Sequence, residues 1–205
     1  IQSAAGILAV SALISRILGL LRDRLLASTF GASANLDVYF AAFRLPDFIY
    51  NILIAGGIVV AFVPLFSEYF LKDKKEAWDF TNNILNVFLF FLLLISLAVG
   101  VFAPFFVKLM TPGFNAEQID LTVLLTRILF LSPIFLGLSS IFSGVSQYFN
   151  RFLIYGLAPI LYNMGIILGI IFLAPIWGIM GVTLGGIIGA LLHFLIQIPS
   201  AVNAG

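Results

Sequence analysis

The stretch ILNVFLFFLLLISLAVGVFAPFFV, residues 84–107, carries no charged side chain and exceeds the about 20 mostly apolar residues that a transmembrane helix needs. Over the whole chain of 205 residues, 62% are hydrophobic and only 9% are charged. Soluble domains carry about 25% charged residues, so this chain could not cover the surface of a water-soluble globule of its size. The sequence therefore predicts an all-α fold, a polytopic bundle of membrane helices.

Outward from this run, five more apolar segments are long enough to cross a bilayer, which gives six predicted transmembrane helices. Their bounds are about 3–30, 36–70, 82–108, 119–150, 154–173 and 178–197. Short connections between them hold the residues typical of turns and helix starts. The first segment has no basic region before it and no small-residue cleavage pattern, so we expect it to be retained as a membrane helix.

Basic residues are distributed unevenly between the loops on the two sides of the predicted bundle. One side has Lys72, Lys74, Lys75 and Arg151, whereas the other has only Lys108, at a helix end. Because cytoplasmic loops are enriched in Lys and Arg, this pattern places the first side in the cytoplasm. With six crossings, both ends of the chain are then expected to be cytoplasmic.

Several functional classes are disfavoured by composition. A net charge of +1 argues against nucleic-acid binding, and the chain has no cysteine and a single histidine, His193, so we expect no disulfide, metal site or cofactor. Four serines, Ser139, Ser140, Ser143 and Ser146, have no nearby His or Lys in the sequence. We expect them to bond across helices or to their own backbone, and the protein not to be an enzyme.

Small residues recur at helical spacing in the last two predicted helices. Gly165 and Gly169 are four residues apart, as are Gly181, Gly185 and Gly189. Such spacing lets the backbones of two membrane helices approach closely, so we expect these helices to pack tightly against each other. A flexing hinge is the alternative.

Four charges interrupt the first apolar segment: Arg16, Arg22, Asp23 and Arg24. A charged side chain at membrane depth costs about 2.5–3.5 kcal/mol on insertion scales, so such residues tend to face cavities or partners. Arg16 and Asp23 are seven residues apart and share a helix face, whereas Arg22 and Arg24 lie off it. Arg16 is expected near mid-bilayer, Asp23 to neutralise Arg16 or Arg22, and Arg24 to extend to the headgroups.

The second segment repeats this pattern, with Asp37 and Arg44 seven residues apart and Asp47 three beyond Arg44, within reach of a helix-surface pair. Pro46 removes a backbone donor and bends the helix beside Arg44. Irregular backbone at membrane depth is tolerated only where protein or water surrounds it. Together with Arg16, these residues predict a water-filled cavity.

Arginines in such a cavity favour an anionic ligand, because guanidinium groups match phosphate and carboxylate with two parallel hydrogen bonds. A diphosphate suits several arginines better than a single carboxylate does. The alternative is an internal ion-pair network that joins the first two helices. The candidate binding residues are Arg16, Arg22, Asp23, Arg44 and Asp37, with Arg127 and Asp47 as further candidates and Pro46, Gly56 and Gly57 as candidate hinges.

Three stretches, SRILGLLRDRLLASTFGAS (15–33), LDVYFAAFRLPDF (36–48) and AFVPLFSEY (61–69), resemble the opening of the MurJ (MviN) family of lipid II flippases. This family belongs to a superfamily with MATE drug exporters and polysaccharide flippases. The resemblance implies fourteen helices in two lobes around a central cavity, of which residues 1–205 form the N-terminal lobe. The C-terminal lobe of the same protein would lie outside this chain.

The resemblance also implies a substrate and a location. The substrate would be lipid II, an undecaprenyl diphosphate with a sugar-peptide headgroup, moved across the bacterial cytoplasmic membrane by alternating access for peptidoglycan synthesis and cell shape. The family's first-helix charges match Arg16, Arg22 and Asp23, its basic residue before Leu-Pro matches Arg44, and its loop aspartate matches Asp37.

The chain departs from the family pattern in its second predicted helix. Where many members have a pair of arginines and then a glutamate, this chain has Tyr50, Asn51 and Ala55. Either other residues, such as Arg127, bind the diphosphate or the substrate differs. The alternatives are an exporter of another lipid-linked oligosaccharide, a drug exporter and a non-transporting scaffold. A cation exporter should show unmatched acidic residues at membrane depth, whereas arginine predominates here.

Overall fold

The computed structural model describes residues 2–55 and 58–202, and within these ranges the chain is helical without any strand. The all-α prediction is therefore confirmed. The elements are α1 (Gln2–Phe30), α2 (Ala34–Ala55), α3 (Ile58–Lys72), α4 (Lys74–Met110), α5 (Ala116–Leu129), α6 (Leu131–Tyr148), α7 (Phe152–Leu168), the π-helix η1 (Gly169–Leu173), α8 (Ala174–Trp177), α9 (Ile179–Leu195) and α10 (Ile198–Val202).

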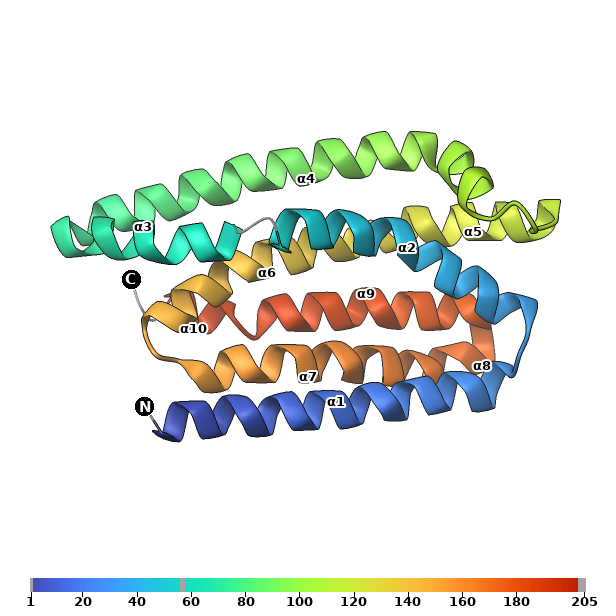
Figure 1. Cartoon of the computed structure of the whole chain (residues 1–205), viewed down its shortest axis with the longest axis horizontal. Helices are drawn as coiled ribbons and strands as arrows, with labels where there is room; N and C mark the ends of the chain where they lie inside the picture. Colours follow the sequence, from blue (N-terminus) through green and yellow to red (C-terminus); the bar gives the residue numbers. More distant parts are fainter. Residues whose placement is uncertain (1, 56–57, 203–205) are drawn as a thin grey trace.

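The long helices run side by side along one axis, so that the bundle has two ends (Figure 1). Both termini, the α3–α4 turn and the α6–α7 turn lie at one end, and the α1–α2, α4–α5 and α8–α9 turns lie at the other. We call the first of these the terminal end. This arrangement agrees with an even number of crossings.

Five helices or helix runs are long and apolar enough to span a membrane: Ala4–Phe30, Lys74–Met110, Ala116–Tyr148, Phe152–Trp177 and Ile179–Val202. The remaining predicted span, 36–70, corresponds to α2 and α3, which together run from one end of the bundle to the other, with α3 beside α4 (Figure 1). The candidate hinge residues Gly56 and Gly57 lie outside the described residues.

The fourth predicted span is not one continuous helix. It ends at Leu129 as α5 and begins again at Leu131 as α6, with Phe130 between them. Pro133 explains the break, because it has no amide hydrogen to donate to the carbonyl of Leu129. The fifth span is longer than predicted, since η1 and α8 continue α7 to Trp177. It ends at Gly178, whose positive φ of 56° favours glycine.

The seam between α7 and α9 is the tightest helix contact in the described part of the bundle. A Cβ atom built on Gly165 would lie 2.3 Å from the Cα of Gly189, and one on Gly169 would lie 2.6 Å from the Cα of Gly185. The two backbones therefore touch, and the predicted close packing of the last two spans is confirmed.

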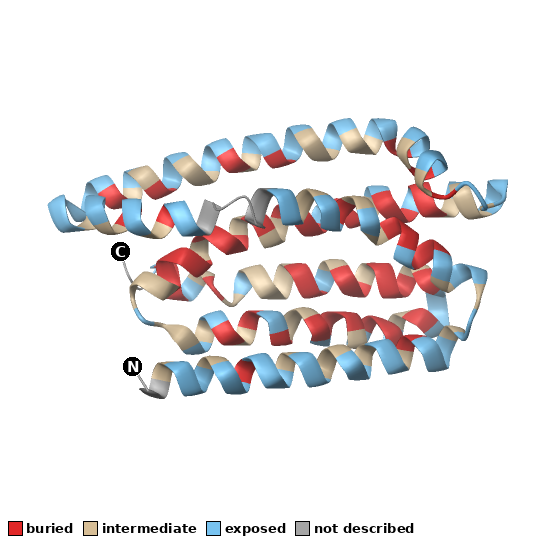
Figure 2. Cartoon of the chain, viewed as in Figure 1, coloured by how far each residue is buried: buried red, intermediate tan, exposed pale blue. Residues whose placement is uncertain are grey.

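Burial divides the bundle into inner and outer helices. α6, α7 and α9 hold many buried residues, whereas α1 and α4 are mostly exposed (Figure 2). α1 packs chiefly on α7, where a Cβ on Gly156 would meet the Ser11 side chain, and it barely touches α2. α2 packs instead on α5 and α6. The fold thus leaves α1 and α2 apart, with α6, α7 and α9 behind them.

Candidate functional site

Three grooves follow α1 from one end of the bundle toward the other. The entry groove, of about 570 Å³, lies between Ala4–Leu8 and the turn at 150–153. The central groove, of about 630 Å³, includes residues 8–16 of α1, and the distal groove, of about 230 Å³, includes residues 22–26. At 1.5 Å per residue, the path from residue 4 to residue 26 covers about 33 Å, close to the thickness of a bilayer core.

The central groove is the largest of the three and the only one with polar residues from five helices. Its polar lining is Ser11, Ser15 and Arg16 from α1, Tyr50 from α2, Ser140, Ser143 and Gln147 from α6, Tyr155 from α7 and His193 from α9. Most of these residues carry hydroxyl or amide groups, and Arg16 is the only arginine or lysine among them. The central groove therefore combines hydroxyl and amide groups with one guanidinium group.

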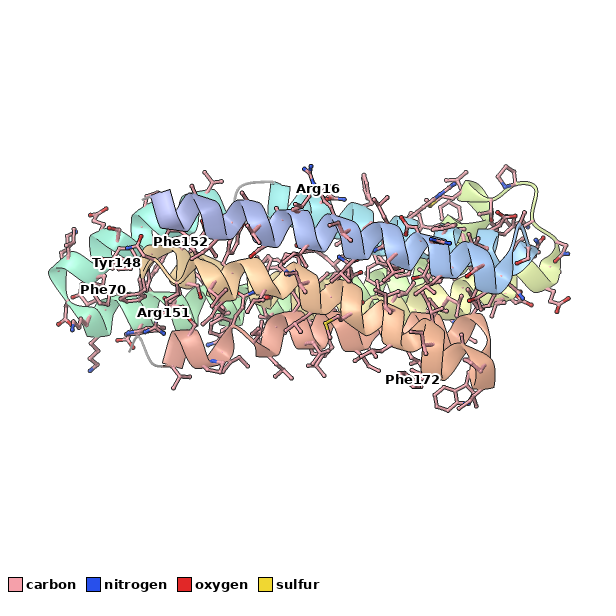
Figure 3. All side chains as sticks on the ribbon, turned by 90° about the horizontal axis from the view of Figure 1, so that it is seen from below. Arg16, Phe70, Tyr148, Arg151, Phe152 and Phe172 are labelled. Atoms are coloured by element: carbon pink, nitrogen blue, oxygen red, sulfur yellow. The ribbon has the colours of Figure 1, made fainter. Side chains whose placement is uncertain are left out.

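Arg16 projects from the edge of α1, about half-way along that helix (Figure 3). It is exposed, and it makes no hydrogen bond or ion pair with any residue that the structure describes. The two ion pairs among the described residues, Arg22–Asp23 and Lys72–Glu68, each lie within one helix. The alternative prediction of an ion-pair network between the first two helices is therefore wrong for this part of the chain.

The distal groove contains the one charged pair of α1. Arg22 Nη2 lies 2.9 Å from Asp23 Oδ1, and Asp47 of α2 lines the same groove without forming an ion pair. Asp23 thus neutralises Arg22 and not Arg16. Arg22 reaches its neighbour because its long side chain can lie along the helix surface. The expected Arg44–Asp47 pair is absent from the described ion pairs.

Asn163, which was not among the predicted site residues, hydrogen-bonds to Ser15 of the central groove and to Arg22 of the distal groove. Its Oδ1 accepts a hydrogen bond from Arg22 Nη1 at 3.1 Å, while its Nδ2 lies 3.2 Å from the Ser15 hydroxyl and 3.2 Å from the Pro159 carbonyl oxygen. The side chain is 8% exposed. The sequence does contain a signal for this residue: Asn163 is the one amide side chain in the apolar run ILYNMGIIL, and a buried amide requires hydrogen-bond partners.

Other predicted site residues lie outside the three grooves. Arg44 and Asp37 are exposed on α2 and line none of them. Arg127 donates from Nε to the carbonyl oxygen of Gly100 on α4, at 2.9 Å. It is therefore placed against α4 and does not replace the missing arginine in the central groove. Pro46 is buried inside α2, which continues through it.

A series of polar contacts, here called the α6–α9 ladder, joins α6 to α9, α10 and the turn between them beside the central groove. Its rungs are Ser139 Oγ with His193 Nδ1 at 2.7 Å, Ser143 Oγ to Gln197 Oε1 at 2.7 Å and Ser146 Oγ to Ser200 Oγ at 3.0 Å. Ser140 bonds instead to its own helix, at the carbonyl oxygen of Gly137. The prediction that these serines bond across helices or to their own backbone is confirmed.

A multi-pass helical bundle with a series of grooves that each contain an arginine has the architecture expected of one lobe of a membrane transporter. Comparison with known proteins gives the family. The family model described as "Lipid II flippase MurJ" matches residues 26–205, so the chain belongs to the MurJ family.

Individual relatives agree with this assignment. The probable lipid II flippase MurJ of Buchnera aphidicola subsp. Acyrthosiphon pisum is 35% identical over 192 residues, covering 91% of this chain and 38% of that protein. The lipid II flippase MurJ of Thermosipho africanus is 35% identical over 198 residues, covering 95% of this chain and 40% of that protein. The chain thus spans about two fifths of the length of these relatives.

The fold is also similar to a solved structure, "Lipid II flippase MurJ, inward closed conformation". The TM-score is 0.81 at 32% sequence identity, and the match covers 96% of this chain and 42% of that one. The resemblance to the MurJ family inferred from the sequence is therefore confirmed over nearly the whole chain.

Proposed function

We propose that this protein takes part in flipping lipid II across the bacterial cytoplasmic membrane, and that the grooves along α1 bind the diphosphate of the lipid. The observation that carries the proposal is the series of three grooves, each with an arginine. Arg151 lies in the entry groove, Arg16 in the central groove and Arg22 in the distal groove. An anion that moves along α1 would meet a guanidinium group at each level.

The central groove is the proposed main binding site, because the three arginines differ in their partners. Arg22 is held by Asp23 and Asn163, and Arg151 donates to the Ser200 carbonyl oxygen. Arg16 has no carboxylate beside it among the described residues. A phosphate would therefore gain its strongest charge-assisted hydrogen bonds at Arg16, and the surrounding hydroxyl groups would donate to its remaining oxygens.

The terminal end of the bundle is proposed to be the cytoplasmic side. Lys72, Lys74, Lys75 and Arg151 gather there, as the enrichment of basic residues in cytoplasmic loops requires (Figure 1). The headgroup would then enter near Ala4–Leu8 while the polyprenyl tail stays in the bilayer. Alternating access would need movement of this lobe against the C-terminal lobe of the same protein, and Pro46 and Gly56–Gly57 remain candidate hinges.

Export of another lipid-linked oligosaccharide is the second candidate function. Such a substrate carries the same diphosphate, and the observation that favours it is Tyr50. This residue lines the central groove where family members similar in sequence are expected to have an arginine. Export of cationic drugs or a scaffold role is less favoured, because neither explains an unpaired guanidinium group in a membrane groove.

The experiment is complementation of a bacterial strain depleted of its own lipid II flippase, with the protein expressed from its complete gene. We expect Arg16→Lys and Arg16→Ala to abolish rescue at unchanged membrane abundance, because lysine cannot form the two-pronged contact. Arg24→Lys is the matched control, since Arg24 is exposed on the same helix and lines no groove. Full rescue by Arg16→Ala would overturn the proposed site, and failure of the unaltered protein would favour a different substrate.

A further inference from the structure

We infer that His193 is a proton-binding site of the central groove, and that proton uptake there accompanies anion binding beside Arg16. This inference rests on the proposed anion site and adds a second, coupled ligand to it. Three features of the structure carry it: the hydrogen bonds that occupy one imidazole nitrogen, the access of the other nitrogen to the groove, and the charges that share the groove.

The hydrogen bonds around Ser139 determine which imidazole nitrogen is occupied. Ser139 Oγ lies 2.6 Å from Gln197 Nε2, 2.7 Å from His193 Nδ1 and 3.1 Å from the His193 carbonyl oxygen. The Gln197 amide nitrogen can only donate, and the carbonyl oxygen can only accept. All three contacts are satisfied when Ser139 donates to the carbonyl oxygen and accepts from Gln197 and from Nδ1–H.

This arrangement makes Nε2 the nitrogen that gains and loses a proton. Nε2 makes no hydrogen bond with a described residue, and it is not among the buried polar atoms without a partner, which include Trp78 Nε1 and Ser132 Oγ. His193 lines the central groove, and Nε2 is its ring nitrogen without a hydrogen bond to a described residue. An imidazole with one nitrogen anchored and the other open to water is a reversible proton acceptor.

The helices around His193 contribute few titratable groups to the groove. Those that line it are Arg16 from α1, Tyr50 from α2 and Tyr155 from α7, whereas α6 contributes no titratable residue to the lining. Asp23 and Asp47 line the distal groove, and the charged residues of α5, Glu117, Asp120 and Arg127, are exposed outside all three grooves. α10 carries no charged residue within Ile198–Val202. Arg16 is thus the one charged side chain that shares the groove with His193.

Coupling between proton and anion follows from this charge distribution. In the empty groove a protonated imidazole shares the groove with a guanidinium group and with no carboxylate to offset it, and like charges disfavour protonation. A phosphate bound at Arg16 removes that repulsion and attracts the proton. By linkage, protonation of His193 must strengthen anion binding by the same factor. Proton uptake from water would then accompany loading of the groove, and proton loss would accompany release.

The test is NMR spectroscopy of the imidazole Cε1–H signal in the protein expressed from its complete gene. The protein is purified with a histidine-free tag into nanodiscs of zwitterionic lipid. The His193 signal is identified by its loss in His193→Asn, and its titration is followed with and without inorganic pyrophosphate. We expect pyrophosphate to raise the titration midpoint by about one pH unit, which corresponds to about tenfold tighter binding on the acidic side.

Two variants control the experiment. His193→Asn keeps a donor near the Nδ1 position for Ser139 but lacks Nε2, so it should fold. Its affinity for pyrophosphate should then change with pH only as far as pyrophosphate itself gains or loses protons. Arg16→Gln should raise the midpoint without pyrophosphate and abolish the response to it. If pyrophosphate binds in an Arg16-dependent way and the midpoint does not move, the coupling is overturned and the proposed anion site stands. If pyrophosphate binds at no pH, both are overturned.

Discussion

The α7–α9 seam and the α1–α2 side of the bundle differ in how closely their helices approach. At the seam, glycines bring two backbones into contact and exclude side chains. On the other side, α1 and α2 scarcely touch, and polar side chains line the space between them. Both regions are formed by apolar helices of membrane-spanning length. The difference shows that small residues let two helices close together, whereas polar residues line the space where α1 and α2 stay apart.

The two regions should therefore respond differently to substitution. At the seam, stability depends on shape, and any added atom must displace a backbone. At the grooves, stability depends little on the polar side chains that face water, whereas function depends on them strongly. Asn163 and the α6–α9 ladder are intermediate, because they are polar and buried at once.

The largest loss of stability is expected from Gly189→Ala at the seam. A Cβ at this position would lie 2.4 Å from the carbonyl oxygen of Tyr162, and a backbone atom cannot move aside as a flexible side chain can. We expect about 3 kcal/mol of destabilisation, the upper part of the range for overpacking. Thermal unfolding of the purified protein, followed by circular dichroism, measures it.

Gly100→Ala is the matched control, because a Cβ at Gly100 meets no atom within 4 Å. It should leave the unfolding temperature unchanged or raise it slightly, since alanine favours a helix over glycine by about 1 kcal/mol. Equal effects of the two substitutions would show that helix propensity, and not backbone contact, explains the glycines of the seam.

The next largest effect is expected from Asn163→Ala. This change removes the contacts that tie α7 to Ser15 and leaves Arg22 with Asp23 alone. Polar contacts between membrane helices contribute about 0.6 to 1.7 kcal/mol, so we expect a loss of about 1–2 kcal/mol. Hydrogen exchange should increase in α1 while exchange in the α7–α9 seam stays unchanged. If hydrogen exchange in α1 were the same in Asn163→Ala and in the unaltered protein, this role of Asn163 would be contradicted.

Much of the fold could be predicted because the features concerned are local in the sequence. Hydrophobic length identifies the spans, and the spacing of Gly165, Gly169 and Gly185 identifies a close contact without any knowledge of its partner atoms. The break at Phe130 was less predictable, because a proline in a membrane helix can either bend the helix or end it.

The site was harder to predict, because its contacts join residues that are far apart in sequence. Asn163 meets Ser15 across 148 positions, and His193 meets Ser139 across 54. Hydrophobic periodicity does not resolve such pairs, since the exposed face of α1 is as apolar as its buried face and includes Leu13 and Leu20. The sequence therefore identified Arg16 as unusual but grouped it with Arg44, which lines none of the grooves.

A smaller effect is expected from Ser143→Ala in the α6–α9 ladder. The change leaves Gln197 Oε1 without its donor inside the bundle, at a residue with no exposed surface. We expect a loss of about 1 kcal/mol in unfolding experiments. Ser140→Ala is a close control, since Ser140 is as buried as Ser143 but bonds only to its own helix. If both variants lose the same stability, the ladder contributes nothing beyond the packing of small side chains.

The smallest change in stability is expected from Arg16→Gln, although this variant should lose function. Arg16 has no partner among the described residues, so removing its charge breaks no contact of the folded chain. We expect the free energy of unfolding to stay within about 0.5 kcal/mol of the unaltered protein, as for surface substitutions. Unfolding and complementation measured on the same preparations separate the two effects. If the variant unfolds several degrees earlier and also fails to complement, Arg16 stabilises the bundle. The contrast between a structural seam and functional grooves would then not hold at Arg16.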